Sequence, residues 1–172
     1  VGPAGALGTQ TNGVSWRLVF SSGEQAAMKT LALPDGWRED VTYVKVDLGA
    51  DYHGTAGFLL EVNGEALGEL SNQMDVPPYL TPSTTAWTKP VPRAVLARAP
   101  MARVVLRPSS LDPRLSIAGH GDPLVEPLKH WNSWFFDGRG WRNDRLAGPA
   151  GGEAAGTYRI WLFRALGVPA EG

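Results

Sequence analysis

The amino-acid sequence predicts an all-β fold, a two-sheet antiparallel β-sandwich of the jelly-roll type. About eight short segments alternate apolar and polar residues with a period of two, which is the pattern of half-buried strands. The 21 glycines and 14 prolines among 172 residues favour many turns over long helices. The one helix candidate, residues 24–33, cannot alone supply the helices that an α/β fold needs.

The length of the chain fits one domain, which we expect to span residues 1–172. Residues 1–13 are predicted to be an irregular lead-in, and they lack the charged start and apolar stretch of a signal peptide. Two segments interrupt the strand pattern. They are a proline-rich excursion at residues 76–100 and a Gly/Ala-rich loop at residues 147–156.

The first strand is predicted in residues 14–21, where Trp16 and Phe20 lie on the face that we expect to be buried. Residues 26–33 are compatible with either a short strand or a helical turn. Pro34-Asp35-Gly36 ends that segment, because proline presets φ and glycine accepts a positive φ.

The clearest unit is a strand, a loop and a hairpin. Residues 41–48 alternate as a strand, and residues 49–57 form a polar loop. Residues 58–62 and 65–70 flank Asn63-Gly64, a pair that favours a type I′ turn with positive φ at both central residues. We therefore expect an antiparallel hairpin here.

The second half of the chain predicts shorter strands. Six prolines between residues 74 and 100 indicate an extended surface excursion or an edge strand, with residues 91–99 pairing in part. Residues 103–107 and 115–118 predict two more short strands. Residues 157–164 (TYRIWLFR) predict a central strand, because both of its faces carry bulky residues.

Composition and motifs exclude several classes of function. Sixteen basic and seventeen acidic residues, spread without runs, argue against a nucleic-acid partner. The chain has no cysteine and no apolar run long enough to insert in a membrane. It also lacks a nucleophile elbow and a P-loop, so we expect a protein that is not an enzyme.

Metal sites find little support in the sequence. The three histidines lie far apart along the chain: His53, His120 and His130. Calcium fits better, since oxygen ligands bracket a glycine-containing loop: Asp137, Asn143 and Asp144. Arginines crowd the same loop and are expected to pair with those carboxylates, so we predict no cofactor.

The densest group of aromatic residues lies between positions 130 and 141. It consists of Trp131, Trp134, Phe135, Phe136 and Trp141. Strand alternation puts Trp134 and Phe136 on one face, which we expect to be core, and leaves Trp131 and Trp141 freer to be exposed. We expect Trp16 and Trp161 in the core as well. Exposed tryptophans beside amide, carboxylate and guanidinium groups suit sugars, and the same combination suits protein interfaces.

We therefore predict a ligand-binding surface around this segment, with filling of the core as the alternative role of its rings. The predicted contacts are Trp131, Arg139, Trp141, Arg142, Asn143 and Asp144, with Tyr52 and His53 on a second candidate loop.

Residues 41–70 (VTYVKVDLGADYHGTAGFLLEVNGEALGEL) resemble the strand–loop–hairpin of galactose-binding-like jelly rolls. Residues 103–119 (RVVLRPSSLDPRLSIAG) are similar to the late strands of such modules, and the two runs cover about 47 of the 172 residues.

This resemblance implies a non-catalytic carbohydrate-binding module. Such a module is expected to be an accessory domain of a larger glycan-related protein of the cell envelope, in the periplasm or outside the cell. The alternative is a structural or assembly jelly-roll domain of the virion or surface-layer type, which makes protein–protein contacts.

Overall fold

The computed structural model describes residues 15–72, 75–120, 132–143, 146–148, 153–154 and 156–171. These residues form fourteen strands and one short helix. In chain order the elements are β1 (Ser15–Leu18), β2 (Ala26–Ala32), β3 (Asp40–Asp47), β4 (Phe58–Val62), β5 (Glu65–Leu70), β6 (Ala86–Val91), α2 (Arg93–Leu96), β7 (Met101–Pro108), β8 (Ile117–His120), β9 (Ser133–Phe136), β10 (Trp141–Arg142), β11 (Leu146–Ala147), β12 (Glu153–Ala154), β13 (Thr157–Tyr158) and β14 (Ile160–Pro169).

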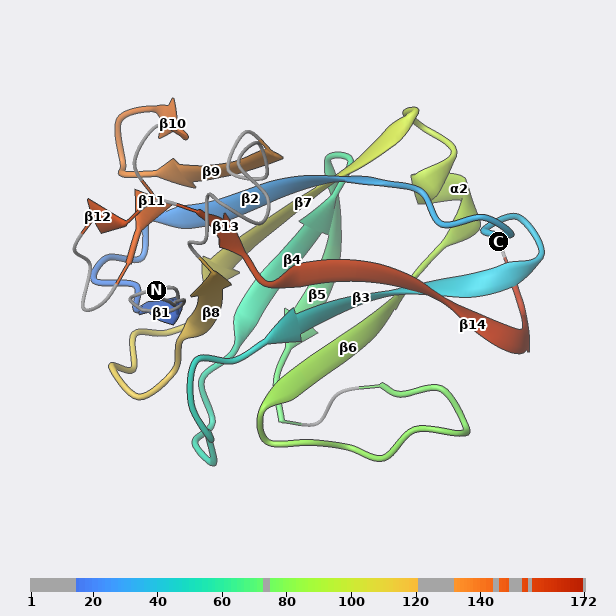
Figure 1. The fold of residues 1–172 in the computed structure, drawn as a ribbon, viewed down its shortest axis with the longest axis horizontal. Coiled ribbons are helices and arrows are strands. Elements are labelled where there is room, and N and C mark those ends of the chain that lie inside the picture. Colours follow the sequence, from blue (N-terminus) through green and yellow to red (C-terminus); the bar gives the residue numbers. More distant parts are fainter. Residues whose placement is uncertain are drawn as a thin grey trace, which may run out of the picture.

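The strands form a sandwich-like, all-β arrangement. One layer is a six-stranded antiparallel sheet with the order β10-β9-β2-β7-β4-β5, and two three-stranded sheets, β14-β3-β6 and β1-β8-β13, face it (Figure 1). Arg159 links the two small sheets, because it lies between β13 and β14. Its N–H donates to the carbonyl oxygen of Ala118, and its own carbonyl oxygen accepts from the N–H of Asp47.

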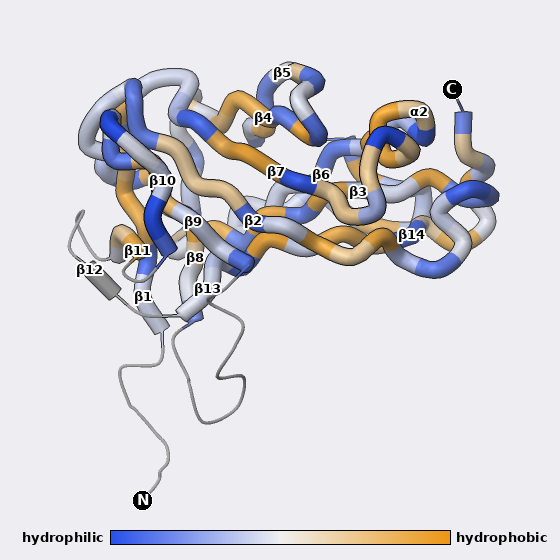
Figure 2. The backbone as a smooth tube through the Cα atoms, turned by 90° about the horizontal axis from the view of Figure 1, so that it is seen from above, coloured by the Kyte–Doolittle hydropathy of each residue, from blue (hydrophilic) through white to orange (hydrophobic). Residues whose placement is uncertain are grey.

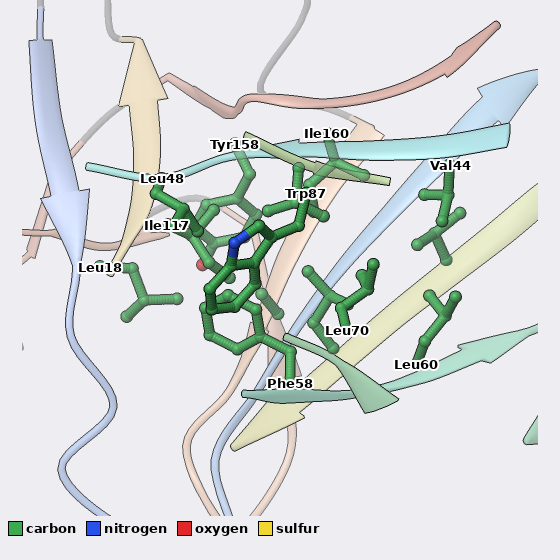
Figure 3. Close-up of a cluster of buried hydrophobic side chains, with 14 of the residues drawn as sticks. Leu18, Val44, Leu48, Phe58, Leu60, Leu70, Trp87, Ile117, Tyr158 and Ile160 are labelled. Carbon is green, nitrogen blue, oxygen red and sulfur yellow. The ribbon is translucent and has the colours of Figure 1, made fainter. Parts of the chain in front are cut away.

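The hydrophobic core lies between the two layers. Hydrophobic segments run along β4, β7 and β14 in Figure 2, and their inward side chains join one large buried cluster. The largest fully buried side chain is Trp87, whose ring lies 5.8 Å from Phe58 and 5.9 Å from Tyr52 between centroids. Figure 3 shows Trp87 in the middle of this cluster, next to Phe58.

The predicted hairpin is confirmed, and the predicted first strand, residues 14–21, is confirmed over Ser15–Leu18. Trp16 and Phe20 are buried, and residues 26–32 form a strand rather than a helical turn. The turn between β4 and β5 has a positive φ at both Asn63 (49°) and Gly64 (85°). The Asn63 side chain also donates to the carbonyl oxygen of Val95 and accepts from the N–H of Arg103, at 3.0 and 2.9 Å.

The proline-rich excursion contains an edge strand, as one of the two interpretations proposed. Of residues 91–99, which were predicted to pair in part, Val91 is paired and the strand ends there. Strand β6 pairs with β3 from Ala86 to Val91, and the chain then turns into α2. Pro92 precedes this helix with a φ of −58°. Proline has no N–H for a β-ladder and a φ that suits the start of a helix, so pairing stops at this point.

Two further predictions need correction. The segment 157–164 is not a central strand, because β14 lies at the edge of the β14-β3-β6 sheet. Two of its bulky side chains, Trp161 and Phe163, line a groove on the outer face of this sheet. Residues 147–156 were predicted to form a loop. Ala147 pairs with Glu153 instead, as part of the short antiparallel ladder between β11 and β12.

In the described part of the chain, no helix has the length and apolar character needed to cross a bilayer. The lead-in at residues 1–13 lies outside the described residues.

Candidate functional site

A groove of about 700 Å³ lies on the outer face of the β14-β3-β6 sheet. Its strand residues alternate with the core residues Val46, Trp87 and Ile160, so it opens on the side that faces away from the core. The groove is lined on the sheet by Lys45, Asp47, Thr88, Arg159, Trp161 and Phe163. Its volume is in the range of small-ligand sites in proteins.

A carboxylate flanked by two cations lies at one end of the groove. Asp47 Oδ2 accepts a hydrogen bond from Arg159 Nε at 2.9 Å, and Asp47 Oδ1 lies 3.5 Å from Lys45 Nζ. The indole N–H of Trp161 donates to Asp47 Oδ2 at 3.3 Å. Asp47 therefore fixes the positions of three groove side chains, which come from β3, from β14 and from the residue that joins β13 to β14.

Trp161 is further positioned by cations near its ring. The guanidinium of Arg159 and the Nζ of Lys29 each lie 5.4 Å from the ring centroid, within the range of cation–π attraction. Lys29 is buried, and its Nζ donates to the carbonyl oxygen of Tyr158 at 2.9 Å. Trp161 was predicted to be core, but it is only partly buried and lines the groove.

Phe163 continues the aromatic floor along β14. It stacks on Tyr43 of β3, with ring centroids 5.5 Å apart and an interplanar angle of 15°. Burial raises the pKa of the Tyr43 hydroxyl, and the neighbouring Asp75 and Tyr79 add to this rise. The Tyr43–Phe163 stack gives the groove a rigid, neutral aromatic end.

The opposite wall of the groove is the chain between β5 and β6, which contributes Thr81, Ser83 and Thr85. This segment is tied down near its end, since the N–H of Leu48 donates to the carbonyl oxygen of Thr85 and Thr84 Oγ1 donates to Asp51 Oδ1. The wall therefore presents hydroxyl groups in fixed positions.

The start of the same segment is tied down too. Thr88 Oγ1 donates to the carbonyl oxygen of Asp75, and the Asp75 carboxylate forms an ion pair with Lys89 at 4.0 Å. Pro77, Pro78 and Pro82 lie between these anchors. Because proline restricts φ, they reduce the conformational freedom of the wall.

The predicted site around residues 130–144 lies elsewhere, on the β9–β10 hairpin of the six-stranded sheet. Trp141 is 40% exposed, and its ring centroid lies 5.3 Å from that of Phe136. Arg139 is in the turn, and Arg142 and Asn143 follow Trp141 at the other end of β10. Trp131 and Asp144 lie outside the described residues, so the structure brings together only part of the predicted surface.

The prediction of which side chains of β9 face the core was wrong. Phe135 is in the main core, whereas Trp134 and Phe136 pack on the outer face of the sheet against Ala26 and Met28. Alternation correctly separates the two faces. Alternation does not show which of the two faces lies against the second layer. Here the face with two rings, Trp134 and Phe136, is the outer one.

The acidic residue of this hairpin has a structural role. Asp137 Oδ1 accepts hydrogen bonds from the N–H groups of Arg139 and Gly140, at 2.8 and 3.2 Å, and these bonds lower the pKa of the Asp137 carboxyl. Within the described ranges, no three His, Cys, Asp or Glu side chains gather as metal ligands would. Of the predicted calcium ligands, Asp144 lies outside those ranges.

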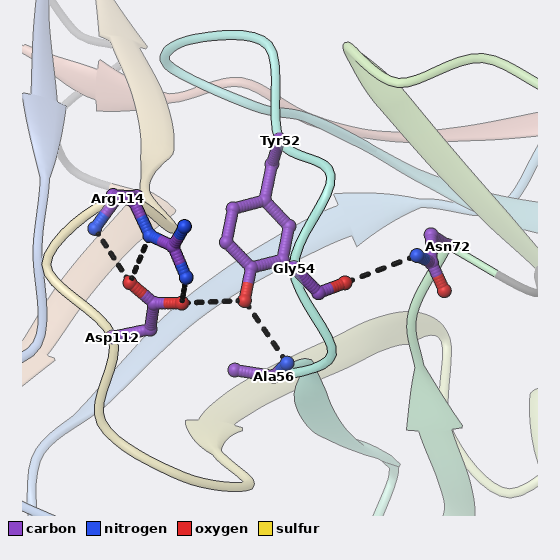
Figure 4. A network of polar contacts seen from close by, with 6 residues as sticks. All are labelled: Tyr52, Gly54, Ala56, Asn72, Asp112 and Arg114. Atoms are coloured by element: carbon purple, nitrogen blue, oxygen red, sulfur yellow. Dashed lines mark hydrogen bonds and ion pairs between the residues drawn. The ribbon is translucent and has the colours of Figure 1, made fainter.

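The second candidate loop contains Tyr52 and His53. His53 is exposed, but Tyr52 is only 1% exposed and its ring belongs to the core, so it is not accessible to a ligand. The Tyr52 hydroxyl donates to Asp112 Oδ2 at 2.8 Å and accepts from the N–H of Ala56 at 2.9 Å (Figure 4). Tyr52 therefore connects this loop to the chain between β7 and β8.

Asp112 is the centre of that connection. Arg114 donates to its carboxylate from Nε at 3.0 Å and from Nη2 at 2.8 Å. Hydrogen bonds from the Arg114 side chain and backbone, and then from Tyr52, hold the pKa of Asp112 well below its usual range. The charged form of Asp112 is therefore the one that stabilises this region.

This network predicts a pH-dependent loss of stability. A carboxyl with a lowered pKa in the folded state stabilises the fold above about pH 4 and loses that contribution as the pH falls. Asp112→Asn should lower the melting temperature by a few degrees at pH 7, and the difference from the wild type should narrow at about pH 3. Thermal melts at both pH values measure this effect.

Asp35→Asn is the matched control for this experiment. It removes a carboxylate from an exposed turn outside the network, and should leave the melting temperature close to that of the wild type at both pH values. If the Asp112→Asn deficit were equally large at pH 3, the charge of Asp112 would not be what stabilises the loop.

The groove residues were missed by the sequence patterns, although two signals pointed to them. The outward residues of β3 include Lys45 and Asp47, and β14 is bulky on both faces. A bulky outward face indicates either a central strand or an aromatic surface that serves a ligand. The second interpretation becomes visible once β14 is placed at a sheet edge.

Comparisons of the chain with protein-family models, with curated proteins and with solved structures find no match.

Proposed function

We propose that this chain is a non-catalytic carbohydrate-binding module whose ligand lies in the groove between β14 and the β5–β6 segment. The observation that carries the proposal is the composition of that groove. Aromatic rings form its floor, hydroxyl groups its wall, and three charged side chains one end.

These groups match the chemistry of a sugar. A pyranose ring presents apolar C–H faces that pack against aromatic carbons, and hydroxyls that take directed hydrogen bonds. Trp161 and Phe163 supply the apolar contacts, while Thr81 and Thr85 supply hydroxyl partners. Because the wall is anchored at both ends, little conformational entropy is lost when the ligand binds.

A binding role fits this groove better than glycoside hydrolysis. Hydrolysis requires two carboxyl groups about 5–10 Å apart across the scissile bond. Asp47 is the one carboxylate among the described residues that line the groove, and both of its oxygens contact cations. We therefore assign Asp47 the task of orienting its neighbours.

The proposal includes the finer predictions made from the sequence. The resemblance of residues 41–70 to galactose-binding-like jelly rolls supports it, since this run contributes Lys45 and Asp47 to the groove. We propose accordingly that the chain is an accessory domain of a glycan-related protein outside the cytoplasm.

The second candidate is an assembly domain that binds other protein subunits. The exposed Trp141, together with the partly buried Trp134 and Phe136 on the outer face of the six-stranded sheet, favours it. Size-exclusion chromatography with light scattering distinguishes the two, because a large closed oligomer without affinity for sugars supports assembly.

A glycan array followed by calorimetry tests the carbohydrate proposal. Thr81 is exposed at the groove and makes no hydrogen bond within the described residues, so Thr81→Trp should fill the groove without disturbing the fold. We expect at least about a tenfold loss of affinity for the best array ligand, which corresponds to the loss of about one good contact.

Thr55→Trp makes the same change on an exposed loop position away from the groove and should bind like the wild type. Trp141→Ala should also bind normally. Loss of binding in Trp141→Ala with normal binding in Thr81→Trp would move the site to the β9–β10 hairpin. Absence of binding to every glycan would refute the carbohydrate proposal.

A further inference from the structure

The charged end of the groove has an excess of positive charge. Two cations, Lys45 and Arg159, accompany one carboxylate, Asp47, so these three groups sum to +1. The whole chain carries a net charge of −1, so this local excess does not follow from the overall composition.

The exposure of the three side chains shows which charge a ligand meets. The side chain of Asp47 is 17% exposed, whereas those of Lys45 and Arg159 are 41% and 42% exposed. The carboxylate is therefore withdrawn beneath its two partners. A ligand in the groove approaches the cations before it reaches Asp47.

Arg159 also retains hydrogen-bonding capacity. Only its Nε donates to Asp47, and neither terminal amino group has an acceptor among the described residues. Lys45 contacts Asp47 at 3.5 Å, which is an ion pair at the outer limit of hydrogen-bond length. Both cations are thus held in place by Asp47 while keeping donors for another group.

Such an arrangement suits an anion. The two terminal nitrogens of a guanidinium form a planar fork that matches the oxygens of a carboxylate, and an ammonium group adds a point charge. The Arg159 guanidinium lies over the Trp161 ring, 5.4 Å from its centroid, so the anion-binding fork and the aromatic floor adjoin each other. A sugar with an anionic substituent would use both at once.

We propose that the groove selects anionic sugars, with Arg159 and Lys45 binding the acidic group while the sugar ring lies against the aromatic floor. This inference rests on the proposed function, since it names the class of glycan that the same groove takes. The anionic group is a carboxylate, as in a hexuronic acid, or a sulfate ester.

The test compares acidic sugars with neutral sugars of the same skeleton. Calorimetry is carried out with the trimers of galacturonic, glucuronic and mannuronic acid, each beside its full methyl ester. A 6-sulfated galactose disaccharide beside its unsulfated form tests the other anion. At least one acidic member should bind about tenfold more tightly than its neutral form, as expected for a charge-assisted bidentate contact. Added salt should reduce this preference.

Variants connect the preference to the two cations. Arg159→Gln and Lys45→Gln should each weaken the acidic ligand about tenfold more than they weaken its neutral form. Arg159→Lys, which keeps the charge but loses the fork, should lie in between. Arg98→Gln is the matched control, because Arg98 pairs with Glu65 and does not line the groove.

The outcomes separate the two proposals. If neutral glycans bind and no acidic member exceeds its neutral form, the groove does not select anions, although it still binds carbohydrate. If the preference persists in both glutamine variants, another part of the chain creates it. If no sugar of either kind binds on the array or in solution, both proposals are wrong.

Discussion

Trp87→Ala should lower the free energy of unfolding by about 3–5 kcal/mol, the range measured when a large aromatic side chain is removed from a packed core. Trp87 has no exposed surface, and its ring contacts both Phe58 and Tyr52. Because Phe58 lies in β4, which is paired with β5 on one side and β7 on the other, this neighbour cannot easily move inward to fill the cavity. For a chain of this length, the melting temperature should fall by on the order of 10 °C.

Trp87→Phe separates the effect of volume from the effect of the indole N–H. That N–H is buried and has no hydrogen-bond partner among the described residues. Phenylalanine removes a polar group that costs free energy to bury, so we expect a loss of only about 1–2 kcal/mol. Urea denaturation monitored through the remaining tryptophans measures both variants. Equal losses in the two variants would contradict the cavity argument.

Gly119→Ala should destabilise the protein by about 1–3 kcal/mol, because it overpacks a site without space. Gly119 lies in β8, where it pairs with Trp16 on one side and Tyr158 on the other. A Cβ atom at this position would overlap the Trp16 ring, which is itself packed edge-on against Tyr158 with centroids 5.7 Å apart. An indole held in this way cannot easily turn aside.

Gly23→Ala provides the matched control, since a Cβ atom there meets open space, and its stability should stay close to that of the wild type. A double-mutant cycle with Trp16→Leu tests the cause. In the Trp16→Leu background, Gly119→Ala should cost much less, because the ring that it strikes is gone. Additive losses would mean that the strain lies elsewhere.

Local sequence patterns predicted those parts of the fold that depend on local rules. Asn63-Gly64 required a turn with positive φ at both residues, and the structure has it. The alternation in residues 41–48 likewise placed the core side chains of β3. In these cases the period of two and the turn residues depend only on neighbours in the chain.

The same patterns misplaced residues whose environment is set by distant strands. Alternation separated Trp134 from Phe135 but could not tell which ring faces the second layer. It placed Trp161 in the core, because a bulky residue in an apolar strand is usually buried. Its partial exposure depends on β14 lying at a sheet edge, which follows from pairing partners far away in sequence.

The candidate groove is the part least accessible to sequence reasoning. Its central contact joins Asp47 to Trp161, which are 114 residues apart. Its wall is a proline-rich segment that the sequence could describe only as a surface excursion or an edge strand. The 21 glycines and 14 prolines therefore indicate that the chain has many turns, but not that one proline-rich segment forms the wall of a groove.

By itself, the sequence determined the all-β character of this protein, its central hairpin and the proline-rich edge, since these follow from local periodicity and turn chemistry. Only the tertiary structure decided that Lys45, Asp47, Arg159 and Trp161 share one groove and that Asp47 is withdrawn beneath its cations. The physical reason is that a strand fixes which side chains share a face, whereas sheet order and layer packing fix what that face meets.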